Sequence, residues 1–352
     1  MLGDAELEQA WPRYLRGDVR GEEIVALAHR AIPAFESVGD DRGLGRAWLL
    51  IAAVRSLHGH WDSCRQAADI ALEHCERSGF PGGACLSMLA ASVYAGPEPV
   101  ETAIQYCKRL VTREPRGVND PSLQLLLVGH LEAMRGRFDV ARDALTRSRV
   151  FLEERGGAPS SEWILMSASV EMLAGQPEVA EAILRDACAR LEARGDRAWL
   201  ATLEAALAEA LYEQNRVDEA SAHSRRAMSL APPDDITAQT AWRRIGARAS
   251  ASAGDAAKAE LLAREAVGIL EKTDSLNDQA AALLSLAEVL FRAAQPDEAR
   301  ETARSGMALL ARKGNVVGLE RARRRFAELN PEATWDAMSP ARRAPEPEPS
   351  SG

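Results

Sequence analysis

Hydrophobic residues along the chain follow a helical spacing that short turns interrupt at regular intervals. Residues 123–156 show the pattern clearly, with Leu126 and His130 on one stripe of a first helix and Leu145 on the inner face of a second. Gly136 stands between the two, and glycine lets a chain leave a helix in a left-handed conformation. This stretch is therefore predicted to be a helical hairpin, which must stack on copies of itself to bury both helices.

The same hairpin recurs with a period near 40 residues. Counted from Gly136, successive turn residues lie 39, 40, 39 and 40 positions apart, and Gly59 lies 77 positions before Gly136, which is two repeats. The predicted turn residues are Gly59, Gly136, Gly175, Asn215, Gly254 and Ala294. A fixed period of this length is the mark of a repeat array, so we expect one continuous solenoid over residues 1–330.

Small residues occupy two fixed places around each predicted turn. Seven residues before the turn stand Ala52, Gly129, Ala168, Ala208, Ala247 and Ala287, and five residues after it stand Cys64, Ala141, Ala180, Ala220, Ala259 and Ala299. At these two places antiparallel helices come closest, so a bulkier side chain would overpack the hairpin at a cost of roughly 1–3 kcal/mol. The predicted fold is all-α, a right-handed solenoid of about eight hairpins with a C-terminal capping helix.

The element boundaries follow from the turns and from the breaks in helical spacing. A wider turn is expected at residues 96–99, followed by a short helix that ends near Glu114. The capping helix, about 316–329, is expected to place Val316, Leu319, Phe326 and Leu329 inward and Arg321, Arg323, Arg324 and Arg325 mostly outward. Residues 331–352 are rich in proline and glutamate and are predicted to be a disordered tail. The predicted hairpins lie near 4–38, 41–78, 81–115, 119–155, 159–194, 196–230, 234–272 and 275–313.

The pattern resembles a tetratricopeptide repeat, in Trp48-x-x-Ile51-Ala52 and in Ala141-x-x-x-Leu145. Its longer period is similar to the extended repeats at the C-terminal end of bacterial ATPase regulators and class III adenylate and guanylate cyclases, a group that includes the maltose-regulon activator family. Residues 134–142 and 313–329 look like the repeat region of actinobacterial cyclase-type ATPases. The resemblance implies a bacterial signalling protein whose first helices line a concave, ligand-facing groove.

One stripe of the first helices is the candidate groove surface. It consists of positions near thirteen, ten, six and three residues before each turn, which share a face by helical spacing. Its central part is apolar with methionines, which adapt to irregular partners, and its later part is charged. The alternative is that these are ordinary inner-wall residues covered by neighbouring repeats. The candidate groove residues are Leu126, His130, Met134, Glu162, Ser169, Met172, Thr202, Glu209, Tyr212, Glu213, Arg244, Arg248, Glu288, Phe291 and Arg292.

Arg244 and Arg248 are the one adjacent basic pair on this stripe. Four residues apart on one helix, they are predicted to present a basic patch to a partner. The alternative is that they pair with Glu209 and Glu288 and hold neighbouring repeats together, an exposed contact worth about 0–1 kcal/mol. The Lys/Asn/Arg clamp of the repeats that bind acidic chaperone tails is replaced here by Leu, His, Ser and Glu, which disfavours that kind of partner.

Composition and charge exclude several classes of function. The net charge of −9 argues against nonspecific nucleic-acid binding. Five cysteines, an odd number without a CxxC pair, predict a reduced, cytoplasmic protein. The longest apolar runs fall short of the roughly 18 residues that a membrane span needs, and the acidic N-terminus does not read as a signal peptide.

The sequence contains none of the motifs that we sought for catalysis. It has no Gly-Lys dipeptide and hence no P-loop, and it lacks HExxH, GxSxG and GxGxxG. Residues 58–60, His-Gly-His, are interpreted as a solvated turn rather than a metal site, because a closed site needs three or four ligands. We therefore expect no enzyme activity, no cofactor and no metal.

Two functions are compatible with these observations. The first is a non-catalytic interaction module whose concave groove binds a protein segment or a small regulatory effector. The second is a detached sensor region that regulates, in trans, a signalling ATPase or nucleotide cyclase. In both, the expected partner is a protein or a small effector and not nucleic acid or a membrane.

Overall fold

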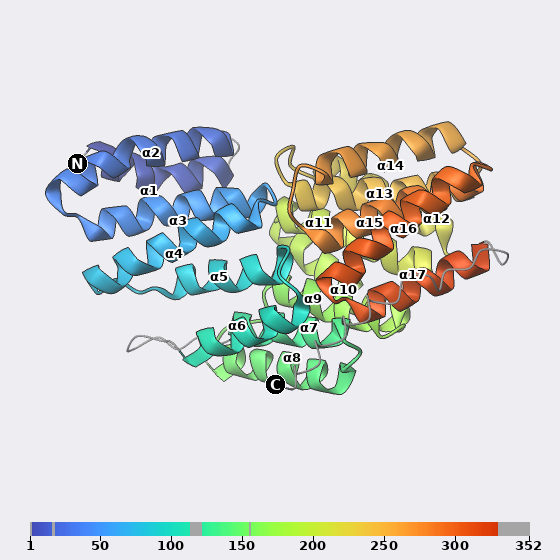
Figure 1. The fold of residues 1–352 in the computed structure, drawn as a ribbon, viewed down its shortest axis with the longest axis horizontal. Coiled ribbons are helices and arrows are strands. Elements are labelled where there is room, and N and C mark those ends of the chain that lie inside the picture. Colours follow the sequence, from blue (N-terminus) through green and yellow to red (C-terminus); the bar gives the residue numbers. More distant parts are fainter. Residues whose placement is uncertain (1, 16–17, 113–121, 155, 330–352) are drawn as a thin grey trace, which may run out of the picture.

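The computed structural model describes residues 2–15, 18–112, 122–154 and 156–329 (Figure 1). Within these ranges every regular element is an α-helix. The helices are α1 (Leu2–Leu15), α2 (Gly21–Val38), α3 (Asp41–Leu57), α4 (Trp61–Ser78), α5 (Gly83–Ala95), α6 (Val100–Thr112), α7 (Ser122–Met134), α8 (Phe138–Glu154), α9 (Ser161–Leu173), α10 (Pro177–Arg194), α11 (Arg197–Glu213), α12 (Val217–Leu230), α13 (Ile236–Ser252), α14 (Ala256–Leu270), α15 (Leu276–Arg292), α16 (Pro296–Lys313) and α17 (Val316–Leu329).

The helices pack as eight successive hairpins, from α1 with α2 to α15 with α16, and α17 follows the last of them. The predicted all-α solenoid is thereby confirmed, and the predicted hairpin at 41–78 coincides with α3 and α4. The expected wider turn lies between α5 and α6. The predicted end of the third hairpin near Glu114 and the predicted tail at 331–352 fall outside the described residues. Across the described helices, none is both long enough and apolar enough to cross a membrane.

All six predicted turn residues have a left-handed backbone. Their φ angles are 67° at Gly59, 81° at Gly136, 74° at Gly175, 61° at Asn215, 86° at Gly254 and 57° at Ala294. Asn tolerates this conformation better than most residues, whereas Ala294 adopts it against its preference. The helix that enters each turn ends there because the reversed φ breaks the i→i−4 hydrogen-bond pattern.

The predicted close contacts between the two helices of each hairpin are present. The residues seven before and five after each turn are buried in all six hairpins. Gly129 on α7 shows how tight the approach is, since a Cβ built there would lie 3.0 Å from the Ala141 carbonyl oxygen and 3.3 Å from the Ala144 Cβ. Small side chains at these places are therefore a packing requirement.

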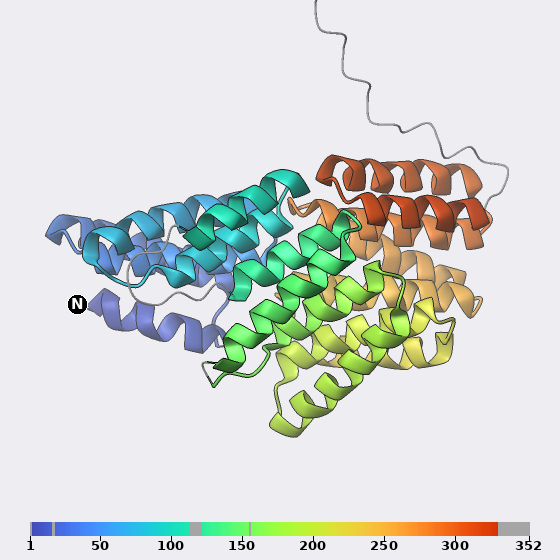
Figure 2. The ribbon, with the colours of Figure 1, turned by 90° about the horizontal axis from the view of Figure 1, so that it is seen from below.

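The first helices of consecutive hairpins form a continuous inner layer. Helices α5, α7, α9, α11, α13 and α15 each contact the next in this series, whereas the second helices mainly contact first helices. Because the inner layer is the more closely packed of the two, the array curves around it. Figure 2 shows the hairpins following one another, with α7 to α10 between the first hairpins and the last.

The curvature brings distant parts of the chain into contact. The loop before α15 reaches the turn before α4, where the Asp274 backbone N–H donates to the Gly59 carbonyl at 3.1 Å. The Asp274 carboxylate accepts from the backbone N–H groups of Trp61 at 2.8 Å and Asp62 at 2.9 Å, and so caps α4. A carboxylate at a helix N-terminus is favoured by the helix dipole. The array is therefore not an open rod, because its second hairpin is joined to the loop between the seventh and eighth hairpins.

Lys313, at the end of α16, makes a second contact between distant hairpins. Its side chain is fully buried, and its Nζ donates to the carbonyl oxygens of Gly96 at 2.7 Å and Val93 at 3.3 Å, at the end of α5. Burial lowers the pKa of Lys313 to about 8. The ammonium group is thus held by backbone dipoles between the third hairpin and the eighth.

The capping helix α17 differs in part from its prediction. Leu319 and Phe326 pack against α15 and α16 as expected. The expected inward position of Val316 is wrong, because its side chain is 48% exposed. Val316 is the first residue of α17 and follows Asn315, whose side chain accepts from the Gly318 backbone N–H at 2.9 Å, so the buried face begins only at Leu319.

We predict that Ala180→Leu destabilises the protein by about 1–3 kcal/mol, because Ala180 is fully buried at a close-approach position. Ala189→Leu, on the exposed side of the same helix α10, is the matched control and should be nearly neutral. The free energies of unfolding from urea denaturation provide the comparison. Equal losses in the two variants would contradict the assigned register.

We also predict that burial of the Lys313 ammonium group lowers the free energy of unfolding in a pH-dependent way. Its folded pKa of about 8 lies below the unfolded value near 10.5, so the unfolded state binds the proton more tightly. The penalty is complete below pH 8 and is relieved as the pH rises from about 8 to 10.5, by up to about 3 kcal/mol. The stability of the wild type relative to Lys313→Met should therefore increase across this window. A pH-independent difference between the two unfolding curves would refute the buried, charge-disfavouring environment.

Candidate functional site

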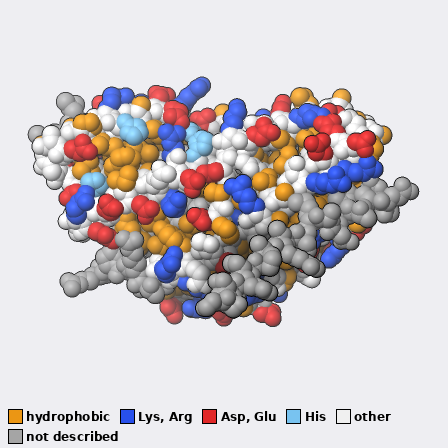
Figure 3. Space-filling view, viewed as in Figure 1, with side chains coloured by type: hydrophobic (Ala, Val, Ile, Leu, Met, Phe, Trp, Pro, Cys, Tyr) orange, Lys and Arg blue, Asp and Glu red, His pale blue; other side chains and the backbone are white. Residues whose placement is uncertain are grey.

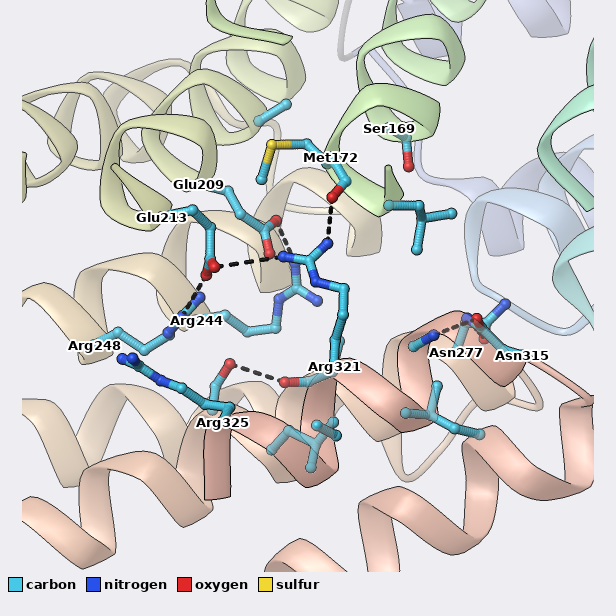
Figure 4. Close-up of a pocket in the computed structure, with 18 of the residues that line it drawn as sticks. Ser169, Met172, Glu209, Glu213, Arg244, Arg248, Asn277, Asn315, Arg321 and Arg325 are labelled. Carbon is cyan, nitrogen blue, oxygen red and sulfur yellow. Dashed lines mark hydrogen bonds and ion pairs between the residues drawn. The ribbon is translucent and has the colours of Figure 1, made fainter. Parts of the chain in front are cut away.

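A pocket of about 360 Å³ opens on the concave side, between the inner helices and α17 (Figure 4). Its lining comes from α9, α10, α11, α13, α15, α16 and α17 and from Asn315 in the turn before α17, so the pocket depends on the position of α17 across the curved inner layer. Most of its surface is apolar, with Leu165, Met172, Leu284 and Phe326 among the contributors. Arginines and glutamates that are coupled to one another supply much of the polar remainder, to which Ser169, Asn277 and Asn315 also contribute.

The buried centre of this network is Glu288 on α15, whose side chain is 3% exposed. Its carboxylate accepts from the Arg325 guanidinium at 2.7 Å, the Tyr212 hydroxyl at 2.7 Å and the Arg248 Nε at 3.1 Å. Burial alone would raise the pKa of Glu288, but the Arg248 and Arg325 guanidiniums outweigh it and lower the pKa to about 2. Glu288 therefore stays ionised and ties α11, α13 and α17 to α15.

Arg248 on α13 lies between two carboxylates. It donates to Glu213 at 2.7 Å as well as to Glu288, and its guanidinium carbon lies 4.1 Å from the centroid of the Tyr212 ring. Stacking on an aromatic face supplements the ion pairs. With its side chain only 11% exposed, Arg248 is part of the wall structure as much as of the pocket surface.

Arg321 on α17 spans the pocket from the opposite side. Its guanidinium donates to the Met172 carbonyl at the end of α9 and lies 3.4 Å from the Glu213 carboxylate on α11. Burial alone would raise the pKa of Glu213, but Arg248 and Arg321 lower it below its usual value. In Figure 4, Arg321 extends between Met172 and Glu213, above Arg244.

Arg244 and Arg248 do not form a free basic patch, because carboxylates pair with both. Arg244 donates to Glu209 at 3.4 Å, and Arg248 pairs with Glu213 and Glu288. The alternative that these arginines hold neighbouring repeats together is therefore the one that the geometry shows. The value of about 0–1 kcal/mol expected for an exposed pair does not apply to Arg248 and Glu288, because both side chains are buried.

The fifteen candidate groove residues fall into three groups. Seven of them line the pocket: Ser169, Met172, Glu209, Glu213, Arg244, Arg248 and Glu288. Five lie buried behind the surface, so they support the wall of the inner layer: Leu126, His130, Met134, Thr202 and Tyr212. The other three do not line the pocket: Glu162 is partly buried, Phe291 packs 5.7 Å from the Phe326 ring, and Arg292 lies 3.5 Å from Glu288.

His130 connects the buried wall to the pocket surface. Its Nδ1 lies 2.8 Å from the Tyr94 hydroxyl, and its Nε2 lies 2.7 Å from the Ser169 hydroxyl at the pocket lining. Burial lowers the pKa of His130 to about 4, so the imidazole is neutral near pH 7. One ring nitrogen then donates and the other accepts, which fixes the orientation of the Ser169 hydroxyl.

Sequence reasoning missed the pocket residues that come from the C-terminal hairpin and cap. Arg321 and Arg325, expected mostly outward, instead face the pocket from α17, while Arg324 is exposed. Asn277 and Asn315 also line the pocket, and their side chains hydrogen-bond to each other at 3.1 Å. The four-residue spacing of Arg321 and Arg325 places them on one face, but only the position of α17 shows where that face points.

The face of the molecule in Figure 3 carries intermingled acidic and basic side chains. The pocket differs from it, since it gathers four arginines and three glutamates around an apolar lining. Chemically, such a site can hydrogen-bond a polar or charged group while it buries an adjacent apolar one.

We predict that Arg248→Met destabilises the protein by about 3–5 kcal/mol, because it leaves the buried Glu288 carboxylate and the partly exposed Glu213 carboxylate with fewer cations. Arg244→Met is the matched control on the same helix; its single carboxylate partner is 3.4 Å away, so the loss should be clearly smaller. Urea denaturation at neutral pH measures both. If the two variants lose the same stability, the central role assigned to Arg248 is wrong.

Comparison with known proteins identifies the type of fold. No protein-family model matches the chain, and no curated protein matches it. A chain of the APC/C hetero-tetramer Cut9–Hcn1 is similar with a TM-score of 0.59 and 13% identity, over 87% of this chain and 57% of that one. The Rap protein complexed with Competence and Sporulation Factor is similar with a TM-score of 0.50 and 16% identity, over 88% of this chain and 82% of that one. Both are helical repeat proteins of the tetratricopeptide type, and this chain has a tetratricopeptide-like fold.

Proposed function

We propose that the chain is a non-catalytic binding module whose concave pocket holds a short segment of a partner protein or a small regulatory effector. The observation that carries the proposal is the pocket between the inner helices and α17, with its volume of about 360 Å³. Ligand pockets in proteins commonly measure about 300–1,000 Å³ and combine an apolar lining with a few oriented polar groups. The pocket has both properties.

The size of the pocket limits its occupant. A volume near the lower end of the usual range accommodates a few residues or one small molecule, not a folded domain. The inner layer and α17 are held together by Glu288 and its three closest donors, so the walls are largely preformed. A preformed site loses less conformational entropy when it binds its ligand.

Proteins of the same fold support a binding role without identifying the ligand. The similar Rap structure is a complex with Competence and Sporulation Factor, and the similar Cut9 chain assembles with Hcn1. At 13% and 16% identity these partners are not transferred to this chain. They agree with the proposal that its partner is a protein or an effector derived from one.

We predict that Ala281→Trp blocks binding, because Ala281 lines the pocket and an indole would fill much of its volume. Ala257→Trp, on the exposed side of α14, is the matched control. Affinity capture from a lysate of the source organism, with mass spectrometry, should recover a partner or effector with the wild type and Ala257→Trp but not with Ala281→Trp. Melting temperatures verify that both variants fold, and equal capture by both would overturn the assignment of the pocket.

A further inference from the structure

The pocket contains more hydrogen-bond donors than acceptors. Four guanidiniums line it, those of Arg244, Arg248, Arg321 and Arg325, and each offers five N–H groups, about 20 in all. Within the described residues these four side chains make six hydrogen bonds to protein acceptors. Water can accept from the solvent-exposed N–H groups. The remaining N–H groups make the pocket a donor of hydrogen bonds to a ligand.

The carboxylates in the pocket are already engaged. Glu288 accepts from three arginines and from Tyr212, Glu213 accepts from two arginines, and Glu209 accepts from Arg244. Four guanidinium charges against three carboxylate charges leave the lining with a net charge of +1, in a protein whose net charge is −9. The local excess of positive charge therefore favours an anion over a cation.

Two of these donors are buried and lack an acceptor. The Nε–H groups of Arg244 and Arg325 have no hydrogen-bond partner among the described residues, although neither is exposed. A buried donor without an acceptor is unfavourable, because it has lost its water without gaining a replacement. Both nitrogens are closed to solvent as the side chains stand, so a ligand oxygen would become their acceptor only after the arginines reorient towards the pocket.

Arg321 is the cation best placed to move towards a ligand. Its side chain is 35% exposed, compared with 11% for Arg248, and its one carboxylate contact, to Glu213, is long at 3.4 Å. Its other partner is the neutral Met172 carbonyl. Exchange of these contacts for a bidentate one to a ligand oxyanion would strengthen the interaction, because guanidinium–oxyanion pairs are planar and charge-assisted.

Apolar side chains lie beside this donor cluster. Leu165, Met172, Leu284 and Phe326 line the same pocket, and the first three are partly exposed or intermediate in burial. An inorganic anion would leave this surface wet. A ligand with an apolar group next to its charged end would cover it, and each buried CH₂ adds to binding.

We propose that the pocket takes an oxyanion joined to a short apolar group, with the oxyanion at Arg244, Arg321 and Arg325 and the apolar group on Leu165, Met172 and Leu284. This inference rests on the proposed function, in which the pocket is the binding site. A carboxylate, as at the end of a peptide, and a phosphate ester share the chemistry that the arginines recognise. Because Arg321 belongs to α17 whereas Leu165 and Met172 belong to α9, the ligand itself would bridge the cap and the inner layer.

The test uses three probes and the NMR signal of the Met172 methyl group, assigned with Met172→Leu. The probes are isovalerate, its uncharged amide isovaleramide, and inorganic phosphate, all at matched ionic strength. Isovalerate should shift the signal saturably, and isovaleramide should bind at least about tenfold more weakly. Arg321→Gln should weaken isovalerate binding about tenfold, whereas Arg324→Gln, exposed on the same helix, should change it less than about twofold.

The outcomes distinguish a carboxylate from a phosphate ester. They also distinguish failure of the oxyanion proposal from failure of the pocket as a binding site. Tighter binding of isovalerate than of phosphate supports a carboxylate ligand, and the reverse supports a phosphate ester. Equal binding of isovalerate and its amide, insensitive to Arg321→Gln, would overturn the oxyanion while leaving the pocket as a binding site. Absence of a saturable shift with both oxyanions would also overturn it, and the capture experiment with Ala281→Trp would then decide separately whether the pocket binds a ligand.

Discussion

Each hairpin depends on one close contact between its two helices. A small residue seven positions before the turn faces the second helix near a small residue five positions after it, as Gly129 faces Ala141. At a separation of 3.0 Å between a built Cβ and a backbone oxygen, the contact admits no larger side chain without movement. Repetition of this contact sets the relation between first and second helices along the chain, and the packed layer of first helices then determines how the array bends.

The curvature of the array creates contacts between hairpins that are distant in the sequence. It brings Asp274 to the N-terminus of α4 and Lys313 to the end of α5, so segments more than 200 residues apart in the sequence share hydrogen bonds. In an open solenoid each repeat contacts only its neighbours. Here the terminal repeats are tied to early ones, which fixes the position of α15 to α17. The pocket depends on that position, because α17 supplies Arg321, Arg325 and Phe326 to its lining.

Features that recur in every hairpin could be predicted from the sequence, whereas contacts that occur only once could not. Gly59, Asn215 and Ala294 were identifiable as turns because six registers agree, even where the residue is not glycine. The pairing of Asp274 with α4 had no such signal, since it occurs once and joins unrelated positions. For the same reason Arg321 and Arg325 read as a solvated face: a stripe of charges on a terminal helix shows its spacing but not what lies opposite.

The candidate site shows the same division. Seven of its lining residues follow from the inner-stripe periodicity, and the pairs Arg244–Glu209 and Arg248–Glu288 match the predicted alternative to an accessible patch. The spacing alone did not decide between the patch and the pairs. The burial of His130 and Tyr212 likewise depends on how far neighbouring repeats cover each first helix. The residues of the inner stripe could be identified from the sequence, but their solvent accessibility could not.

A buried ionic network is a costly way to hold helices together. Each ion that leaves water loses several kcal/mol of hydration, and apolar residues of similar size often serve stability as well or better. The closure of the array needs no such network, since Asp274 and Lys313 achieve it with backbone partners. Alanine and leucine make up much of the apolar packing of the inner layer. Buried glutamates that pair with arginine also occur at Glu132 on α7 and Glu204 on α11. The cavity between the inner layer and α17 gathers four arginines and three glutamates in its lining. What sets this cluster apart is that its guanidiniums face a cavity, which is the basis of the proposal that they serve a ligand as well as stability.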